Sequence, residues 1–324
     1  MHPPLPAPDF DAATAYPEIG VLRAALAAGD WPAVRRLWDR LDWAGRSHLA
    51  VAVGAIARPA ETAHLINVLR AALAADPGDP AAGPMLGSHL ISAGWRVRGA
   101  SRARYVSERQ FREFHEHLRR AEAVLIEATA RDPENVAAWQ MRVTSARGLE
   151  LGAEEAQRRY DRLARTDPHH LNAQTSLLQM LCPKWSRGPW DRVHTFARER
   201  MLAAPEGAHN AVLVVDGHLE HWLDLPGGED GEYLMSQPVR DEIYAAAYRS
   251  VWHPAFRRTF GWVYVLNMFA GVFTMVGDHR AAAGLFAALG PLATESPWDY
   301  LGGNPGETFV TRRAAAIAGA GVPA

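Results

Sequence analysis

Two Asp-Pro steps bracket residues 132–168, and their spacing constrains the fold more than any other feature of this sequence. Pro133 and Pro168 are 35 residues apart. Because proline cannot continue a helix, each step marks a point where a helix ends. Between the steps the apolar residues have helical spacing, with Trp139 in the first half and Tyr160 in the second. The segment therefore predicts a pair of helices that forms one unit of a repeat.

Helical periodicity continues along the rest of the chain. Ser107-Glu108-Arg109-Gln110 has the form of a capping box and predicts a helix that runs to Arg131. No run of alternating β-branched residues is long enough for a sheet. We therefore predict an all-α protein of antiparallel helix pairs, stacked as an irregular α-solenoid. A flexible lead-in (1–16) precedes a single domain (17–318, with the clearest repeats in 61–205), and a short tail (319–324) follows it.

The spacing resembles that of tetratricopeptide-like repeat proteins. Trp139, Ala156, Tyr160 and Pro168 occupy the aromatic, small, aromatic and closing-proline positions of that repeat. The resemblance covers 132–168 and, less closely, 61–94 and 169–205. It implies that small residues let paired helices approach closely, that Trp139 and Tyr160 fill the core, and that a groove holds another molecule.

The chain departs from this repeat at several places. Arg142 stands where leucine is usual and Gln174 where an aromatic residue is usual. The turn around Pro183-Lys184-Trp185 resembles a turn in an uncharacterised bacterial family of repeat-like proteins, and this second resemblance implies no activity. Long inserts in a helical protein are often functional, and here they cover 95–106, 182–189, 224–238 and 291–307.

Composition narrows the classes of partner. The net charge of −2 gives no basic footprint for nucleic acid, and 48% hydrophobic with 22% charged residues is typical of a folded globular chain. Cys182 is the single cysteine, which excludes an internal disulfide and fits a reducing cytoplasm. The amino terminus has no signal-peptide pattern. Only Lys184 among 34 basic residues is a lysine, a bias that suggests GC-rich coding and a bacterial source.

One apolar stretch raises the question of a membrane. Residues 260–276 are apolar apart from Asn267 and Thr274, but the stretch has only 17 residues and barely spans a bilayer. A helical segment that begins near Arg280 follows directly. We therefore expect a buried inner helix and no membrane partner.

Lys184 is the leading candidate for a binding residue. Pro183 and Pro189 restrict the backbone of its turn, so Lys184 and Trp185 are presented with little conformational freedom. We predict that both border the main concave surface, with His194 close by on the following helix. The alternative is a surface lysine in a tight turn whose tryptophan packs on the core.

Other candidates have simpler alternative explanations. His218 and His221 lie at helical spacing i and i+3, which can hold zinc, but their surroundings match no metalloprotease signature, so hydrogen-bonded histidines are favoured and no metal is predicted. Arg96 and Arg98, with Arg102 and Arg104, could grip an acidic peptide or phosphate, or could be solvated charges on a loop. Cys182 is expected to be a buried thiol.

No phosphate-binding loop, serine-nucleophile motif or paired zinc cysteines occur in the sequence. The leading hypothesis is a binding protein that holds a protein or peptide in a concave groove, without a cofactor. A small-molecule ligand is the alternative partner. The alternative function is an enzyme whose pocket is built around Lys184, Trp185 and His194, and a third is a purely structural subunit.

Overall fold

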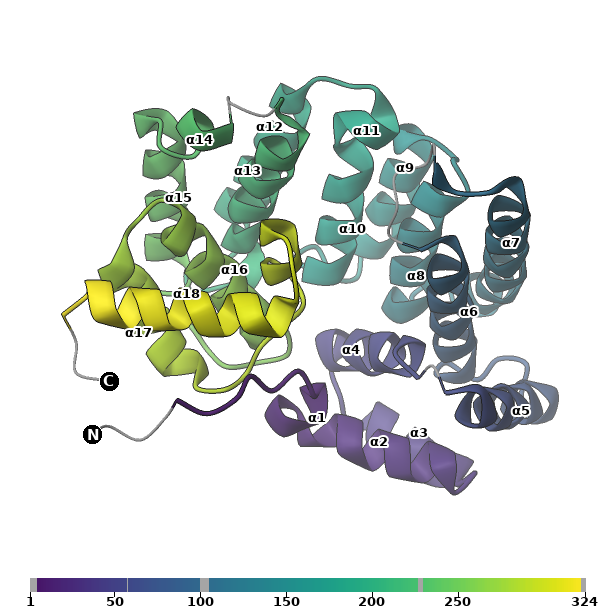
Figure 1. The fold of residues 1–324 in the computed structure, drawn as a ribbon. Helices are drawn as coiled ribbons and strands as arrows, with labels where there is room; N and C mark the ends of the chain where they lie inside the picture. Colours follow the sequence, from purple (N-terminus) through teal and green to yellow (C-terminus); the bar gives the residue numbers. More distant parts are fainter. Residues whose placement is uncertain (1–4, 57, 100–104, 227–229, 322–324) are drawn as a thin grey trace. The chain divides into compact units, whose positions relative to one another are not determined.

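The computed structural model describes residues 5–56, 58–99, 105–226 and 230–321 (Figure 1). Across these ranges the regular elements are helices and no strand occurs, which confirms the all-α prediction. The chain divides into two compact units, Tyr16–Arg187 and Gly188–Ala324 with Met1–Ala15. Each unit is described by itself below. The stacking of helix pairs into a solenoid, and the single domain over 17–318, stay predictions.

The unit Tyr16–Arg187 contains ten α-helices among its described residues. The predicted capping box at Ser107 is present, because its side chain accepts from the Gln110 backbone while the Gln110 side chain accepts from the Ser107 backbone. The helices are α2 (Pro17–Ala27), α3 (Trp31–Asp39), α4 (Trp43–Gly54), α5 (Pro59–Ala75), α6 (Ala82–Arg98), α7 (Glu108–Arg131), α8 (Val136–Gly148), α9 (Ala153–Ala164), α10 (Leu171–Leu181) and α11 (Pro183–Ser186).

Small residues bring α6 and α7 close together. A Cβ atom added at Gly87 would lie 2.6 Å from Leu125 Cδ2, and one added at Gly83 would lie 2.9 Å from the Ala128 Cβ. Both distances are too short for a real contact, so glycine is required at these points for the helices to pack as they do. Ala121 is fully buried on the same helix as Ala128. The expected close approach at small residues is confirmed for this pair.

The two aromatic residues of the predicted repeat have different roles. Tyr160 is 2% exposed, as predicted. Trp139 is only partly buried, and its indole Nε1 donates to the Pro133 carbonyl at 2.9 Å. The Arg142 guanidinium lies 4.8 Å from the centre of the Trp139 ring and covers it. Trp139 therefore closes the edge of the helix pair and does not fill its centre.

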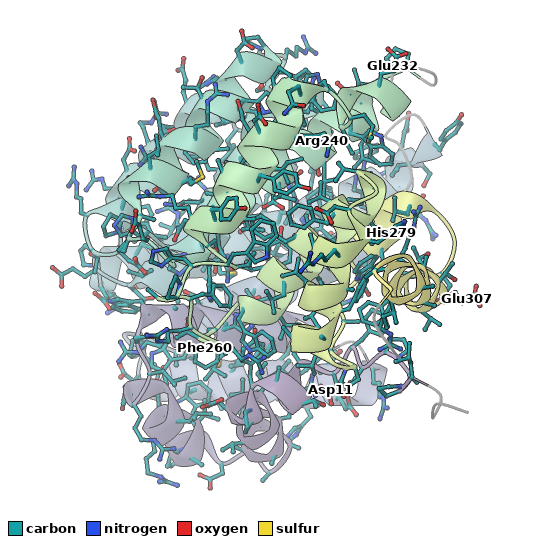
Figure 2. All side chains as sticks on the ribbon, turned by 90° about the vertical axis from the view of Figure 1, so that its left-hand side faces the viewer. Asp11, Glu232, Arg240, Phe260, His279 and Glu307 are labelled. Atoms are coloured by element: carbon teal, nitrogen blue, oxygen red, sulfur yellow. The ribbon has the colours of Figure 1, made fainter. Side chains whose placement is uncertain are left out.

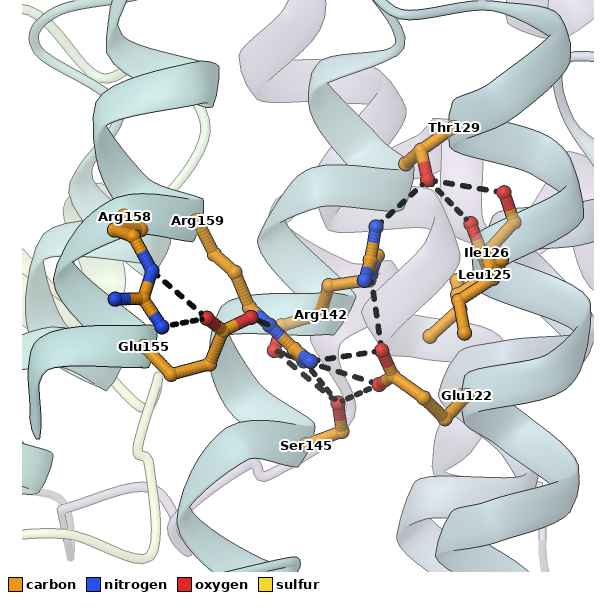
Figure 3. A network of polar contacts seen from close by, with 9 residues as sticks. All are labelled: Glu122, Leu125, Ile126, Thr129, Arg142, Ser145, Glu155, Arg158 and Arg159. Carbon is orange, nitrogen blue, oxygen red and sulfur yellow. Dashed lines mark hydrogen bonds and ion pairs between the residues drawn. The ribbon is translucent and has the colours of Figure 1, made fainter. Parts of the chain in front are cut away.

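Arg142 and Gln174, the two residues that depart from the repeat pattern, both have polar partners inside this unit. Arg142 donates to Glu122 at 3.0 Å, and Arg159 lies 2.9 Å from the same carboxylate (Figure 3). The three side chains are only 15%, 12% and 6% exposed for Arg142, Glu122 and Arg159. Gln174 is buried and donates to the Tyr160 hydroxyl at 3.0 Å. A buried ion network and a buried amide thus replace the expected apolar contacts.

The second unit has eight α-helices among its described residues, with two short 3-10 helices. They are α1 (Ala12–Ala15), α12 (Trp190–Ala203), η2 (His209–Ala211), α13 (Val212–Asp224), α14 (Asp230–Tyr233), α15 (Gln237–Arg249), α16 (Trp262–Met275), α17 (His279–Leu289), η3 (Trp298–Leu301) and α18 (Pro305–Gly319). Helix α13 packs against α12, α15 and α16. Every residue from Val212 to Glu220 is consequently buried.

The apolar stretch 260–276 forms α16, which is an internal helix of this unit. Twelve of its fourteen residues are buried. Asn267, the polar residue at its centre, accepts from the Trp298 indole Nε1 at 2.8 Å and donates to the Val263 carbonyl at 2.8 Å. The prediction of a buried helix is therefore confirmed.

Two of the segments expected to be loops pack against the helices of the second unit. Trp298 is fully buried and packs against Phe286 and Phe309 of α17 and α18. Figure 2 marks the first turns of these helices at His279 and Glu307. In the predicted lead-in, the Asp9 backbone N–H donates to Pro291 O and Asp9 O accepts from Ala293, at 2.7 and 2.8 Å. Residues 9 and 291–307 thus belong to the folded unit.

Candidate functional site

The polar residues of α13 are internal because the helix is covered by its neighbours. Asp216, His218 and Glu220 are all at most 5% exposed. At 100° per residue, His218 and His221 lie on one face of the helix, whereas Asp216 and Glu220 lie on the opposite face. Buried polar groups need partners inside the protein, so each face of α13 carries its own polar cluster.

The first cluster, here called the histidine chain, consists of His194, His218, His221, Tyr233 and Glu242. His218 Nδ1 lies 2.8 Å from the Tyr233 hydroxyl, and His218 Nε2 lies 3.2 Å from Glu242 Oε2. His194 Nε2 lies 3.0 Å from His221 Nδ1 and 3.3 Å from the Tyr233 hydroxyl. Helices α12, α13, α14 and α15 therefore meet through one connected set of hydrogen bonds.

The surroundings of this chain lower the pKa values of Glu242, His194 and His221. The hydrogen bond from His218 lowers the pKa of Glu242 to about 2, with help from Arg198, which donates to Glu242 at 2.9 Å. Burial lowers the pKa of His194 to about 3, and the neighbouring imidazoles His218 and His221 add to this effect. Burial also lowers the pKa of His221. At neutral pH, His194 and His221 are therefore uncharged.

Neutral imidazoles of such low basicity have limited chemical use. A general base works best when its pKa is near the operating pH, which His194 does not satisfy. Burial also raises the pKa of Tyr233, which makes its hydroxyl a poor nucleophile. Across the described ranges, no group of three or more His, Cys, Asp or Glu side chains is arranged to hold a metal ion. The chain suits the holding of helices better than proton transfer at neutral pH.

The second cluster lies around Asp216. Tyr264 donates to Asp216 Oδ1 at 2.7 Å, while Asp216 Oδ2 is buried without a hydrogen-bond partner. Burial and, to a smaller extent, the nearby Glu220 raise the pKa of Asp216 to about 7, against the lowering effect of the Tyr264 hydrogen bond. Asp216 therefore titrates close to neutral pH inside the unit.

Replacing Asp216 by asparagine is expected to change how stability depends on pH. The folded state binds one more proton than the unfolded chain between pH 3.8 and about 7. The stabilisation is complete below pH 3.8 and is lost as the pH rises through 7. Asparagine keeps the acceptor for Tyr264 but does not ionise. From pH 4 to pH 8 the wild type should thus lose about 4 kcal/mol relative to Asp216→Asn, as measured by urea denaturation. A difference between the two proteins that does not vary with pH would show that Asp216 is ionised throughout.

The candidates Trp185, Arg98 and Arg96 lie in the other unit. The Arg147 guanidinium stands over the rings of Trp95 and Trp185, at 5.1 and 5.4 Å from their centres. Arg98 lies 5.5 Å from the centre of the Trp95 ring. Arg96 donates to the Gly54 carbonyl at 2.8 Å and so ties α6 to α4. Arg102 and Arg104 lie outside the described residues. Arg98 and Arg147 thus lie on tryptophan rings, Arg96 binds a backbone carbonyl, and the binding of an acidic ligand by these arginines stays a prediction.

Lys184 is exposed on α11, in the same unit as Trp185. His194 belongs to α12 in the other unit. The predicted approach of His194 to Lys184 and Trp185 therefore stays a prediction. Instead, His194 lies with His218 and His221, which the sequence analysis treated as a separate pair. Cys182 is buried, as predicted, and its thiol donates to the Leu178 carbonyl.

A groove of about 800 Å³ lies between α2, α4 and α5 in the unit Tyr16–Arg187. Its apolar lining includes Leu26, Ala52, Ile56 and Leu65, and its charged lining consists of Arg23, Arg58 and Glu61, with His64 beside them. Ala27, Ala55, Arg58, Glu61 and His64 are exposed in the groove walls. It is consequently an open trough and not an enclosed pocket.

Sequence reasoning predicted a groove without its position, and it missed Tyr233, Glu242 and Asp216. The groove forms where α2, α4 and α5 pack together, so no local motif marks it. Tyr233 falls in the segment 224–238, which was interpreted as a loop, and Glu242 lies one helix further on. One feature of the sequence does indicate a polar site in this region. Several polar residues stand close together, from Asp216 to His221, in a helix that is otherwise apolar.

Comparison with known proteins gives no matching family model, no similar curated protein and no similar solved structure. In the ranges that the structure describes, no helix combines the length and the apolar character needed to cross a membrane. The fold and the sites therefore define the class of an all-α protein with an open apolar groove, and function has to be argued from these sites.

Proposed function

We propose that this protein is a helical binding protein that holds a segment of a partner protein in the groove between α2, α4 and α5. The observation that carries the proposal is the groove itself, an open trough with an apolar lining and charged residues along its walls. Amphipathic helices bind proteins in grooves of this kind, with their apolar face against the lining.

The charges of the groove favour an acidic partner. Two arginines, Arg23 and Arg58, and one carboxylate, Glu61, line the groove, and Glu61 lies 3.2 Å from the Arg58 guanidinium. The rim thus has a net positive charge, and complementary charge guides both specificity and the rate of association. We infer that the bound segment is an amphipathic helix with leucine-like residues on one face and glutamates beside them.

The proposal can be tested with a designed peptide. A fluorescent helical probe with leucines at positions i, i+3, i+4 and i+7 and glutamates between them is expected to bind saturably in fluorescence polarisation. Ala27→Arg, which places a long side chain in the trough, should weaken binding at least tenfold. Ala63→Arg is the matched control, because Ala63 is an exposed alanine of α5 that does not line the groove. A probe with lysines in place of glutamates should bind more weakly.

Two results would contradict this proposal. One is the absence of saturable binding by the acidic probe. The other is an equal affinity for the wild type and for Ala27→Arg. The enzyme alternative around Lys184, Trp185 and His194 has less support, because burial lowers the pKa of His194 to about 3 and leaves a weak base.

A further inference from the structure

The histidine chain has a defined direction of hydrogen bonding. The ionised Glu242 can only accept, so His218 Nε2 carries a proton and donates to it. His218 Nδ1 lies 2.8 Å from the Tyr233 hydroxyl, which can donate or accept. Between the other two imidazoles, only one of the facing nitrogens, His194 Nε2 and His221 Nδ1, can carry a proton. Each facing pair thus has one donor and one acceptor.

Added protons destroy this complementarity. If both His194 Nε2 and His221 Nδ1 carried protons, two N–H groups would face each other at 3.0 Å. The ring centres of His194 and His218 are 4.7 Å apart, and those of His194 and His221 are 5.2 Å apart. Two imidazolium ions at such distances repel each other.

The charges around the chain compensate for only part of this repulsion. Helix α12 contributes Asp191, His194 and Arg198, and α15 contributes Glu242. From α13 come His218, His221 and Asp224, and α14 contributes Tyr233. Glu242 is already paired with Arg198 at 2.9 Å. Asp191 and Asp224 raise the pKa of His221, but the one carboxylate that acts on His194 is Glu242, which is shared with Arg198.

Helix α14 is the element that depends most on the chain. It has four residues, too few for a stable isolated helix. Its last residue, Tyr233, forms the hydrogen bonds to α12 and α13, and the following Leu234 is buried. Loss of the Tyr233 contacts would leave mainly Leu234 to hold this segment.

We propose that the histidine chain is an acid-sensitive latch, which holds α14 against α12 and α13 while His194 and His221 are neutral and releases it when they gain protons. Release uncovers the imidazoles together with Trp190, whose ring stacks on His221 at 4.4 Å. The partners lie in α12 to α15 of one unit, and the latch is independent of the groove.

Hydrogen exchange of the full-length protein tests the latch. We expect the amides of residues 230–236 to lose protection between pH 7.5 and pH 5.0, after correction for the intrinsic rates. His194 has a pKa of about 3 in the closed state and is expected to have its ordinary value of 6.5 in the open state. Protonation at pH 5.0 therefore increases the equilibrium constant for opening about thirtyfold, relative to the neutral histidine. Helix α17, which contributes nothing to the chain, should keep its protection.

Two variants separate the latch from a general acid effect. His194→Gln keeps an N–H donor but does not titrate, so its pH response should fall to about threefold or less. His253→Gln is the control, since His253 pairs with Glu206 away from the chain and the variant should respond like the wild type. The proposal is overturned if residues 230–236 change protection less than threefold in the wild type, if His194→Gln responds like the wild type, or if α17 loses protection together with α14.

Discussion

Replacement of Glu122 by alanine is expected to lower the free energy of unfolding by about 3–5 kcal/mol. Glu122 binds Arg142 and Arg159 at 3.0 and 2.9 Å, in surroundings that leave the three side chains largely buried. It also accepts from the Ser145 hydroxyl at 2.7 Å. Without this carboxylate, two guanidinium groups would remain buried without their shared counter-charge. Arg142 would lose its carboxylate partner and Arg159 would keep only Glu155 at 2.8 Å, so the cost is mainly that of the under-paired cations. Urea denaturation followed by circular dichroism measures it.

Two comparisons make this prediction specific. Glu127→Ala removes the partner of Arg131, but that pair is 57% and 49% exposed for Glu127 and Arg131, so the loss should stay below about 1 kcal/mol. Replacing Glu122, Arg142 and Arg159 together by apolar residues of similar volume should cost much less than Glu122→Ala alone. If Glu122→Ala loses as little as Glu127→Ala, the buried network does not form in solution.

Trp298→Ala is expected to have an effect of similar size, about 3–5 kcal/mol, in the other unit. The fully buried indole packs against Phe286 and Phe309, so its removal opens a cavity between α17 and α18. It also takes away the donor that satisfies Asn267 Oδ1 at 2.8 Å inside α16. An unsatisfied buried acceptor adds about 1–3 kcal/mol, which places the result at the upper end of the range.

The control for this change is Tyr248→Ala. Tyr248 is 66% exposed and touches Trp252 at its edge, so the loss should be within about 1 kcal/mol. Trp298→Phe should fall between the two, because it keeps part of the ring packing and loses the N–H donor. An unchanged denaturation midpoint for Trp298→Ala would mean that residues 291–307 are a surface loop, as the sequence had indicated.

The elements of this fold follow from local sequence. The capping box at Ser107 predicted the start of α7 and its end at Arg131, because capping is decided by residues three positions apart. The apolar stretch 260–276 predicted α16, because a run that long must be removed from water. Small residues in α6 and α7 predicted close packing, because only glycine and alanine let two backbones approach.

The candidate sites depended on contacts that local sequence does not contain. Arg142 departs from the repeat pattern because it pairs with Glu122, which lies twenty positions earlier in the sequence. The Trp298 indole donates to the Asn267 side chain only because α16 and η3 pack together. The approach of His194 to the turn at Lys184 stays a prediction, and its hydrogen bonds to His221 and Tyr233 join residues 27 and 39 positions away in the sequence.

The sequence by itself determined that this protein is helical, where α7 begins and ends, and which apolar stretch is internal. These properties depend on propensity, capping and periodicity, which act over a few residues. Only the tertiary structure decided which polar residues meet, that Asp216 titrates near neutral pH, and that α2, α4 and α5 form a groove. Charge pairing, desolvation and the shape of a surface arise between helices that are far apart in sequence, so no single segment specifies them.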